Sequence, residues 1–121
     1  MKGDDIVERL VALAVRIIKI VDALPETTTG RHLAGQLLRS GTSAGANYEE
    51  ARGAESKRDF LHKLGISLKE LQESQYWLRV VAGARLVAED LGAVVSEVGE
   101  LCRIIGKSRL TAQSPHGLHD R

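Results

Sequence analysis

A leucine repeat in the middle of the chain restricts its fold more than any other feature. Leucines occupy successive heptad core positions there: Leu61, Leu64, Leu68, Leu71 and Leu78. Such positions line one face of an α-helix, and long helices with this face pack nearly parallel to one another. Only Gln75 interrupts the repeat, and Ser56 precedes it as a capping residue. The repeat therefore predicts a long helix from Lys57 inside a helical bundle.

Three more segments have helical periodicity. The first runs from Asp4 or Asp5, as its cap, to Pro25, and the second runs from Arg31 to Arg52 behind a cap somewhere in residues 27–29. The last begins around residues 88–90, whose acidic groups favour a helix start. Short connections make consecutive helices antiparallel. We expect an all-α, antiparallel up-and-down four-helix bundle as a single domain over residues 1–110, and a disordered tail over residues 111–121.

The first helix has a wider apolar arc than one bundle seam requires. Its main stripe is flanked by a second apolar set: Val7, Val11, Ala14 and Ile18. Excess apolar surface on a helix indicates a further partner, such as another subunit.

Small residues fill one face of the second helix, where Gly41 and Gly45 lie four residues apart. Glycine inside a helix costs about 0.5–1 kcal/mol relative to alanine, so the pair requires a reason. Close helix packing is one interpretation, and a backbone surface open to a ligand is the other.

Charge and cysteine content limit the partners and the compartment. The 17 Lys and Arg residues nearly balance the 16 Asp and Glu residues, which argues against indiscriminate nucleic-acid binding. The lone Cys102 lies among apolar residues, which favours a buried structural thiol over a reactive one. No apolar run is long enough to cross a membrane, and the start of the chain does not resemble a signal peptide. We expect a cytoplasmic protein.

Residues for catalysis or metal binding are not grouped. The four histidines, His32, His62, His116 and His119, lack the partners of a bundle metal site. The segment from Ser40 to Gly45 matches neither a nucleophile elbow nor a phosphate-binding loop. We therefore expect no enzyme activity, metal, cofactor or small-molecule substrate.

A polar strip is the most informative feature of the second helix. Residues at steps of three or four form it: Gln36, Arg39, Ser43, Asn47 and Glu50. Glu70 and Glu73 flank the leucines of the third helix. One interpretation is a solvated face with local charge pairs. The other is a partly buried network of Arg39, Asn47 and Glu70 that fixes helix register.

Residues 35–51 resemble the signature of a bacterial family named for intervening sequences in 23S ribosomal RNA genes. The pattern is matched at Gln36, Leu37, Arg39, Ser40, Ser43, Asn47 and Glu50. A second block is matched at residues 60–71, while Tyr48 and Ala51 depart from the usual Ile and Gly. The resemblance implies a four-helix bundle and a ring-like homopentamer. Related accessory proteins of diversity-generating retroelements form such pentamers and work with nucleic acid and a reverse transcriptase.

Two functions follow as hypotheses. The first is a homo-oligomeric scaffold or interaction module, motivated by the wide apolar arc of the first helix. The second is binding of RNA or DNA through basic residues around the second connection, which a ring would repeat. These residues are Arg31, Arg39, Arg52, Lys57, Arg58 and Lys63.

Overall fold

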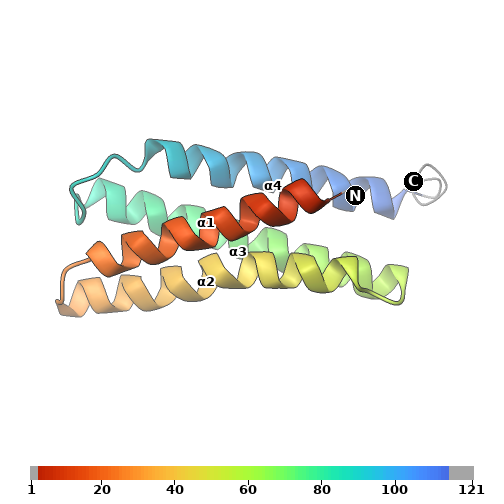
Figure 1. Cartoon of the computed structure of the whole chain (residues 1–121), viewed down its shortest axis with the longest axis horizontal. Coiled ribbons are helices and arrows are strands. Elements are labelled where there is room, and N and C mark those ends of the chain that lie inside the picture. Colours follow the sequence, from red (N-terminus) through yellow and green to blue (C-terminus); the bar gives the residue numbers. More distant parts are fainter. Residues whose placement is uncertain (1–2, 115–121) are drawn as a thin grey trace.

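Four antiparallel helices make up the part of the chain that the computed structural model describes, residues 3–114. They are α1 (Asp4–Ala23), α2 (Thr28–Arg52), α3 (Lys57–Gly83) and α4 (Gly92–Gln113). The α1–α2 and α3–α4 connections lie at one end of the bundle and the α2–α3 connection at the other (Figure 1). The predicted all-α, up-and-down four-helix bundle is confirmed. No helix within residues 3–114 has the length and apolar character needed to cross a membrane.

Side-chain caps fix the starts of the two central helices. The hydroxyl of Thr27 accepts a hydrogen bond from the Gly30 amide at 3.0 Å, so the cap of α2 is the first of the three candidate threonines. Ser56 accepts one from the Asp59 amide at 3.0 Å and begins α3 as predicted. Each cap satisfies one amide that has no partner within its helix.

The predicted cap of α1 and the predicted start of α4 differ from the structure, although α1 does begin at Asp4. The residue before α1 is Gly3, with a φ of 93° that suits glycine, and the carboxylate of Asp4 lies 2.6 Å from Arg52 on α2. Residues 88–90 precede α4, because the Asp90 carboxylate accepts a hydrogen bond from the Gly92 amide at 2.8 Å and holds the chain in a turn. The acidic residues near position 90 therefore predicted the region in which α4 starts, but placed the start a few residues too early.

The end of α4 also differs from the prediction. The helix continues through Gln113, and Ala112 is fully buried, so residues 111–113 belong to the bundle. The remainder of the predicted tail, residues 115–121, lies outside the described residues.

The core follows the predicted apolar stripes. In α3 the seven-residue repeat Leu64, Leu71 and Leu78 is almost fully buried, while Leu61 and Leu68 are half-buried at the edge facing α4. The last buried residue of α1 is Ile20, whereas the apolar Val21 that follows it is only partly buried. The straight helical period of 3.6 residues brings position 20 back over the core.

Glycine brings α1 and α2 close together. A Cβ on Gly41 would lie 2.5 Å from Cδ1 of Ile17, and one on Gly45 would lie 3.2 Å from Cβ of Leu10. The contact at Gly41 leaves no room for a side chain and the one at Gly45 is tight, so the small-residue face of α2 serves helix packing. Of the two interpretations of this face, the structure favours packing over an open ligand surface.

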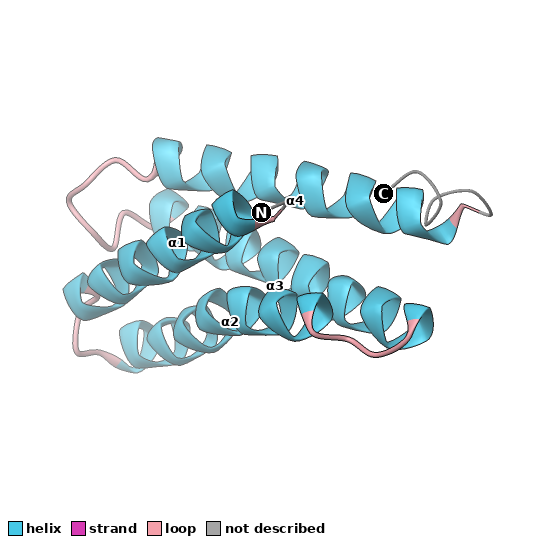
Figure 2. Cartoon of the chain, turned by 45° about the vertical axis from the view of Figure 1, so that its right-hand side comes forward, coloured by secondary structure: helices cyan, strands magenta, loops and turns pink. Residues whose placement is uncertain are grey.

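The seam between α1 and α4 is the loosest of the four (Figure 2). Ion pairs cross it. The guanidinium of Arg9 donates to both carboxylate oxygens of Glu97 on α4, at 2.9 and 2.7 Å. Arg16 donates at 2.9 Å to Glu89, which lies in the α3–α4 connection. The hydrogen bonds from Arg9 hold the pKa of Glu97 below its usual value. A charged pair thus bridges the two neighbouring helices whose backbones approach each other least.

Candidate functional site

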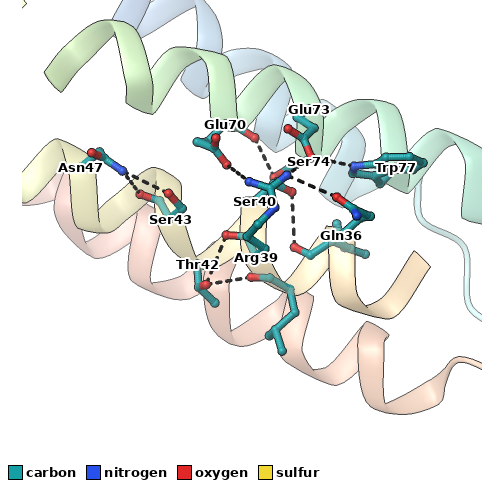
Figure 3. Close-up of polar contacts among 12 residues, drawn as sticks. Gln36, Arg39, Ser40, Thr42, Ser43, Asn47, Glu70, Glu73, Ser74 and Trp77 are labelled. Carbon is teal, nitrogen blue, oxygen red and sulfur yellow. Dashed lines mark hydrogen bonds and ion pairs between the residues drawn. The ribbon is translucent and has the colours of Figure 1, made fainter. Parts of the chain in front are cut away.

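Arg39 is the centre of a charged cluster on the outer side of the α2–α3 seam (Figure 3). Its guanidinium donates to Glu70 at 3.0 Å, to Glu73, and to the side-chain oxygen of Gln36 at 3.4 Å. Half of the Arg39 side chain is exposed, whereas only 15% of Glu70 is. The cluster therefore combines a mostly buried carboxylate, that of Glu70, with a cation that water can reach.

Aromatic rings extend the cluster along α3. The indole nitrogen of Trp77 donates to Glu73 at 3.0 Å, and the ring of His32 meets the Trp77 ring edge-on at 6.0 Å between centroids. The ring of Tyr76 also meets this indole edge-on, at 5.0 Å between centroids. Trp77 thus holds Glu73 within α3, and the bond from Arg39 to Glu73 joins α2 to α3.

Buried serines lie beneath the charged cluster. Ser74 and Ser40 share a hydrogen bond of 2.9 Å across the helix interface, and the Ser74 hydroxyl lies 2.8 Å from the Glu70 carbonyl oxygen. Further along, the Ser67 hydroxyl donates to the carbonyl of Ala44 at 2.7 Å. All three serines are fully buried, and no buried side-chain polar atom in residues 3–114 lacks a partner. The seam therefore combines close approach with full hydrogen bonding.

The predicted polar strip divides into three parts. Gln36, Arg39 and Glu70 meet in the cluster described above. Asn47 instead donates to the backbone carbonyl and hydroxyl of Ser43 within α2, at 3.0 Å each. Glu50 accepts from Lys63 of α3 at 2.8 Å, near the α2–α3 connection. The network that the sequence suggested therefore joins Arg39 to Glu70, extends to Glu73, and does not include Asn47.

Half of the predicted basic patch is engaged with carboxylates. Arg39 has its two glutamates, Arg52 pairs with Asp4 and Glu49, and Lys63 pairs with Glu50. Hydrogen bonding to Asp4 raises the pKa of Arg52, and hydrogen bonding to Glu50 raises that of Lys63. The other three residues make no ion pair with a described carboxylate, although Arg31 donates to the Glu26 carbonyl at 3.2 Å. They are Arg31, Lys57 and Arg58.

Sequence reasoning overlooked Ser67, Ser74 and Trp77 in this seam. A signal for them exists, because Ser67, Glu70, Ser74 and Trp77 follow steps of three and four residues and so share one side of α3. The leucine repeat on the adjacent face is the stronger pattern, so this polar side was not recognised.

The seam contains donors and acceptors but no arrangement typical of catalysis. Its serines bond to backbone and to each other, and no histidine or carboxylate is placed to activate them. No group of three potential metal ligands forms within residues 3–114. His116 and His119 lie outside the described residues. What the geometry provides is a fixed register between two long helices, with a charged strip facing solvent.

These features define an all-α, up-and-down bundle protein with a polar seam between its central helices. The sequence profile of the 23S rRNA-intervening sequence protein family matches residues 3–107, and the chain belongs to this family. A search of curated proteins gives no match.

The chain is also similar to a solved structure, that of a protein of unknown function from the S23 ribosomal protein family of Bacteroides thetaiotaomicron. It shares 32% sequence identity and a TM-score of 0.76, over 84% of this chain and 94% of that one. The predicted family resemblance is confirmed.

Proposed function

We propose that the chain is a non-enzymatic, cytoplasmic interaction module whose copies assemble through an apolar surface on α1 and α2. The observation that carries this proposal is the exposure of four large apolar side chains on these two helices. They are Val11 at 52%, Val15 at 47%, Ile18 at 41% and Leu38 at 40%. We call this set the α1/α2 stripe.

The stripe is continuous because the two helices pack closely and in opposite directions. Val11, Val15 and Ile18 follow steps of four and three residues, so they share one side of α1. Contact between the Gly41 and Ile17 positions sets Leu38 of α2 at about the level of Ile18. Burying one such side chain stabilises an interface by roughly 1.5–3 kcal/mol when burial is complete. A surface of this kind on a small bundle favours association with another apolar surface.

Self-assembly is the form of association that we infer, and a closed ring of five is the form that the family resemblance implies. The hydroxyl of Thr42, which follows Leu38 by one turn, donates to the Leu38 carbonyl at 2.7 Å. That bond leaves the methyl group of Thr42 to extend the apolar surface. The polar seam of α2 and α3 would then hold the two helices in register while the stripe is buried.

Sedimentation velocity of the purified chain tests the proposal. We expect a species several times the protomer mass, and Ile18→Glu should convert it to smaller species because a charge would be buried. Lys19→Glu is the matched control, since Lys19 is the exposed neighbour of Ile18 outside the stripe. A monomeric wild-type chain at micromolar concentration would refute self-assembly.

Nucleic-acid binding is the second candidate function. The observation in its favour is that Lys57 and Arg58, at the start of α3, form no ion pair within the described part of the chain. A closed oligomer would repeat this pair of cations and so concentrate positive charge. Against it, Arg39, Arg52 and Lys63 are already neutralised by glutamates and an aspartate.

A salt titration tests this second function. Binding of a labelled RNA or DNA oligonucleotide should weaken steeply with added salt and should fall in Lys57→Gln/Arg58→Gln. Binding that is insensitive to salt would contradict a contact made mainly with phosphates.

A further inference from the structure

The α3–α4 seam carries a hollow with an apolar floor and a cationic rim. Its volume is about 400 Å³. We call it the α3/α4 groove and define it by Leu68, Arg103, Gly106, Lys107, Arg109 and Leu110. The groove adjoins a wider hollow of about 880 Å³ at the α2–α3 end of the bundle, and Arg109 lines both.

Glycines on both helices create the groove. A Cβ on Gly106 would lie 3.9 Å from Cδ2 of Leu68, so the absence of a side chain leaves part of this leucine open to the groove. On the facing helix, Gly65 makes room for the guanidinium of Arg109, whose Nε would lie 3.3 Å from a Cβ there. Arg109 Nε also donates to the Leu61 carbonyl, at 3.4 Å, so this cation is held beside the apolar floor.

The groove exposes an unusual combination of groups. Leu110 is 70% exposed, more than any other large apolar side chain of the described residues. Arg103 and Lys107 are exposed on the same helix, and neither they nor Arg109 forms an ion pair within residues 3–114. Cations without an ion pair, beside the exposed Leu110 and the partly exposed Leu68, are complementary to a ligand that is both acidic and apolar.

We propose that the α3/α4 groove binds an acidic, leucine-containing amphipathic segment of a protein partner. Leucines of such a segment would cover Leu68 and Leu110, and its carboxylates would pair with Arg103 and Lys107. Nucleic acid is a poorer fit, because its sugar-phosphate backbone gains little from leucine and no aromatic residue lines the groove for base stacking. This binding goes beyond self-assembly, since the groove lies on α3 and α4 and the stripe on α1 and α2.

Fluorescence anisotropy with a defined probe tests the proposal on the full chain. The probe is a labelled peptide in which leucine recurs every three or four residues and glutamate occupies the other positions. A peptide of the same composition with the leucines scrambled, a labelled polyglutamate and a labelled oligouridylate are the comparison probes. The amphipathic peptide should bind more tightly than all three at the same salt concentration.

Variants at the groove separate its apolar and charged parts. Leu110→Ser should weaken peptide binding about tenfold, because burial of a leucine is lost. Arg103→Gln/Lys107→Gln should weaken it about three- to tenfold and reduce its salt dependence. Lys19→Gln/Arg85→Gln removes the same charge from exposed positions elsewhere and should change nothing. All these residues are at the surface, so the variants should fold.

Other outcomes would overturn the proposal. Equal binding of the scrambled peptide would show that the apolar residues contribute nothing, and tighter binding of the oligouridylate would make the groove a nucleic-acid site.

Removal of residues 115–121 should leave affinity unchanged, whereas a tenfold gain would show that the chain's own end occupies the groove. Sedimentation keeps the two proposals distinct: Leu38→Ser should reduce the assembly and preserve peptide binding. If Leu110→Ser dispersed the assembly, the groove would be a contact between copies.

Discussion

Ser40 of α2 and Ser74 of α3 share a hydrogen bond of 2.9 Å at a point where both side chains are fully buried. Small hydroxyl side chains let the helix backbones approach and still satisfy each other, which larger apolar residues could not do at this distance. The bond ties the two longest helices together directly beneath the charged cluster around Arg39. The register of α2 and α3 therefore depends both on this buried hydrogen bond and on the charged cluster at the surface.

Ser74→Ala should lower the free energy of unfolding by about 1 kcal/mol, because the Ser40 hydroxyl loses its strongest partner. Ser74→Leu should lower it by about 1–3 kcal/mol through overpacking. Urea denaturation at one fixed protomer concentration measures both changes. An unchanged midpoint for Ser74→Leu would show that the interface is less tightly packed than the structure indicates.

Gly41→Ala should be destabilising by about 1–3 kcal/mol even though alanine favours helix formation. The new Cβ would meet two methyl groups of Ile17, at 2.5 and 2.9 Å, and Ile17 is fully buried. Gly35→Ala is the matched control, because nothing lies within 4 Å of its Cβ position. It should stabilise the chain by up to about 1 kcal/mol. Thermal unfolding distinguishes the two signs.

Arg39→Gln should lower stability by about 1 kcal/mol, because Glu70 and Glu73 would be left close together without their cation. In a Glu70→Gln/Glu73→Gln background the same substitution should have almost no effect. This double-mutant cycle measures the coupling, and added salt should reduce it. Equal losses in both backgrounds would show that Arg39 acts through packing of its side chain instead.

Acid should weaken the Arg9–Glu97 pair. The pKa of Glu97 is lower in the folded chain than in the unfolded one, where it is about 4.3. The pair therefore contributes to the free energy of unfolding at neutral pH, and this contribution is lost as pH falls through the folded-state pKa. The stability difference between wild type and Glu97→Gln should therefore shrink below about pH 4. Urea midpoints across pH provide the measurement. A difference that is constant from neutral to acid pH would contradict this linkage.

Cys102 should react slowly with a thiol reagent in the folded chain. Burial raises the pKa of its thiol, so the thiolate is scarcer than in an ordinary cysteine at the same pH. We expect a rate about tenfold below that of the urea-unfolded chain, rising with pH. Equal rates in the two states would indicate that the thiol is open to solvent.

Strong periodicity made most of the fold predictable. The seven-residue recurrence from Leu64 to Leu78 identified the longest helix and its buried face, because both depend only on local spacing. The cap of α1 and the start of α4 were wrong, because Asp4 pairs with Arg52, far away in the sequence, and Asp90 bonds to the Gly92 amide. Acidic residues near a helix start fit several positions, and tertiary contacts choose among them.

The candidate site was less predictable than the fold. Arg39 and Glu70 were identified because each lies on a polar strip, and the two strips face each other. Asn47 lies on the same strip as Arg39, yet its amide bonds within its own helix. Helical spacing gives the side of a helix on which a residue lies, whereas the choice between an intrahelical and an interhelical partner depends on side-chain length and local separation.

The sparse contact between α1 and α4 has a consequence for the order in which the bundle opens. Since α1 packs chiefly on α2, its release breaks one main interface and the few ion pairs of Arg9 and Arg16, whereas release of α2 or α3 breaks two extensive ones. Backbone amides of α1 should therefore exchange with deuterium through partial opening, sooner than those of the central helices, which must wait for global unfolding.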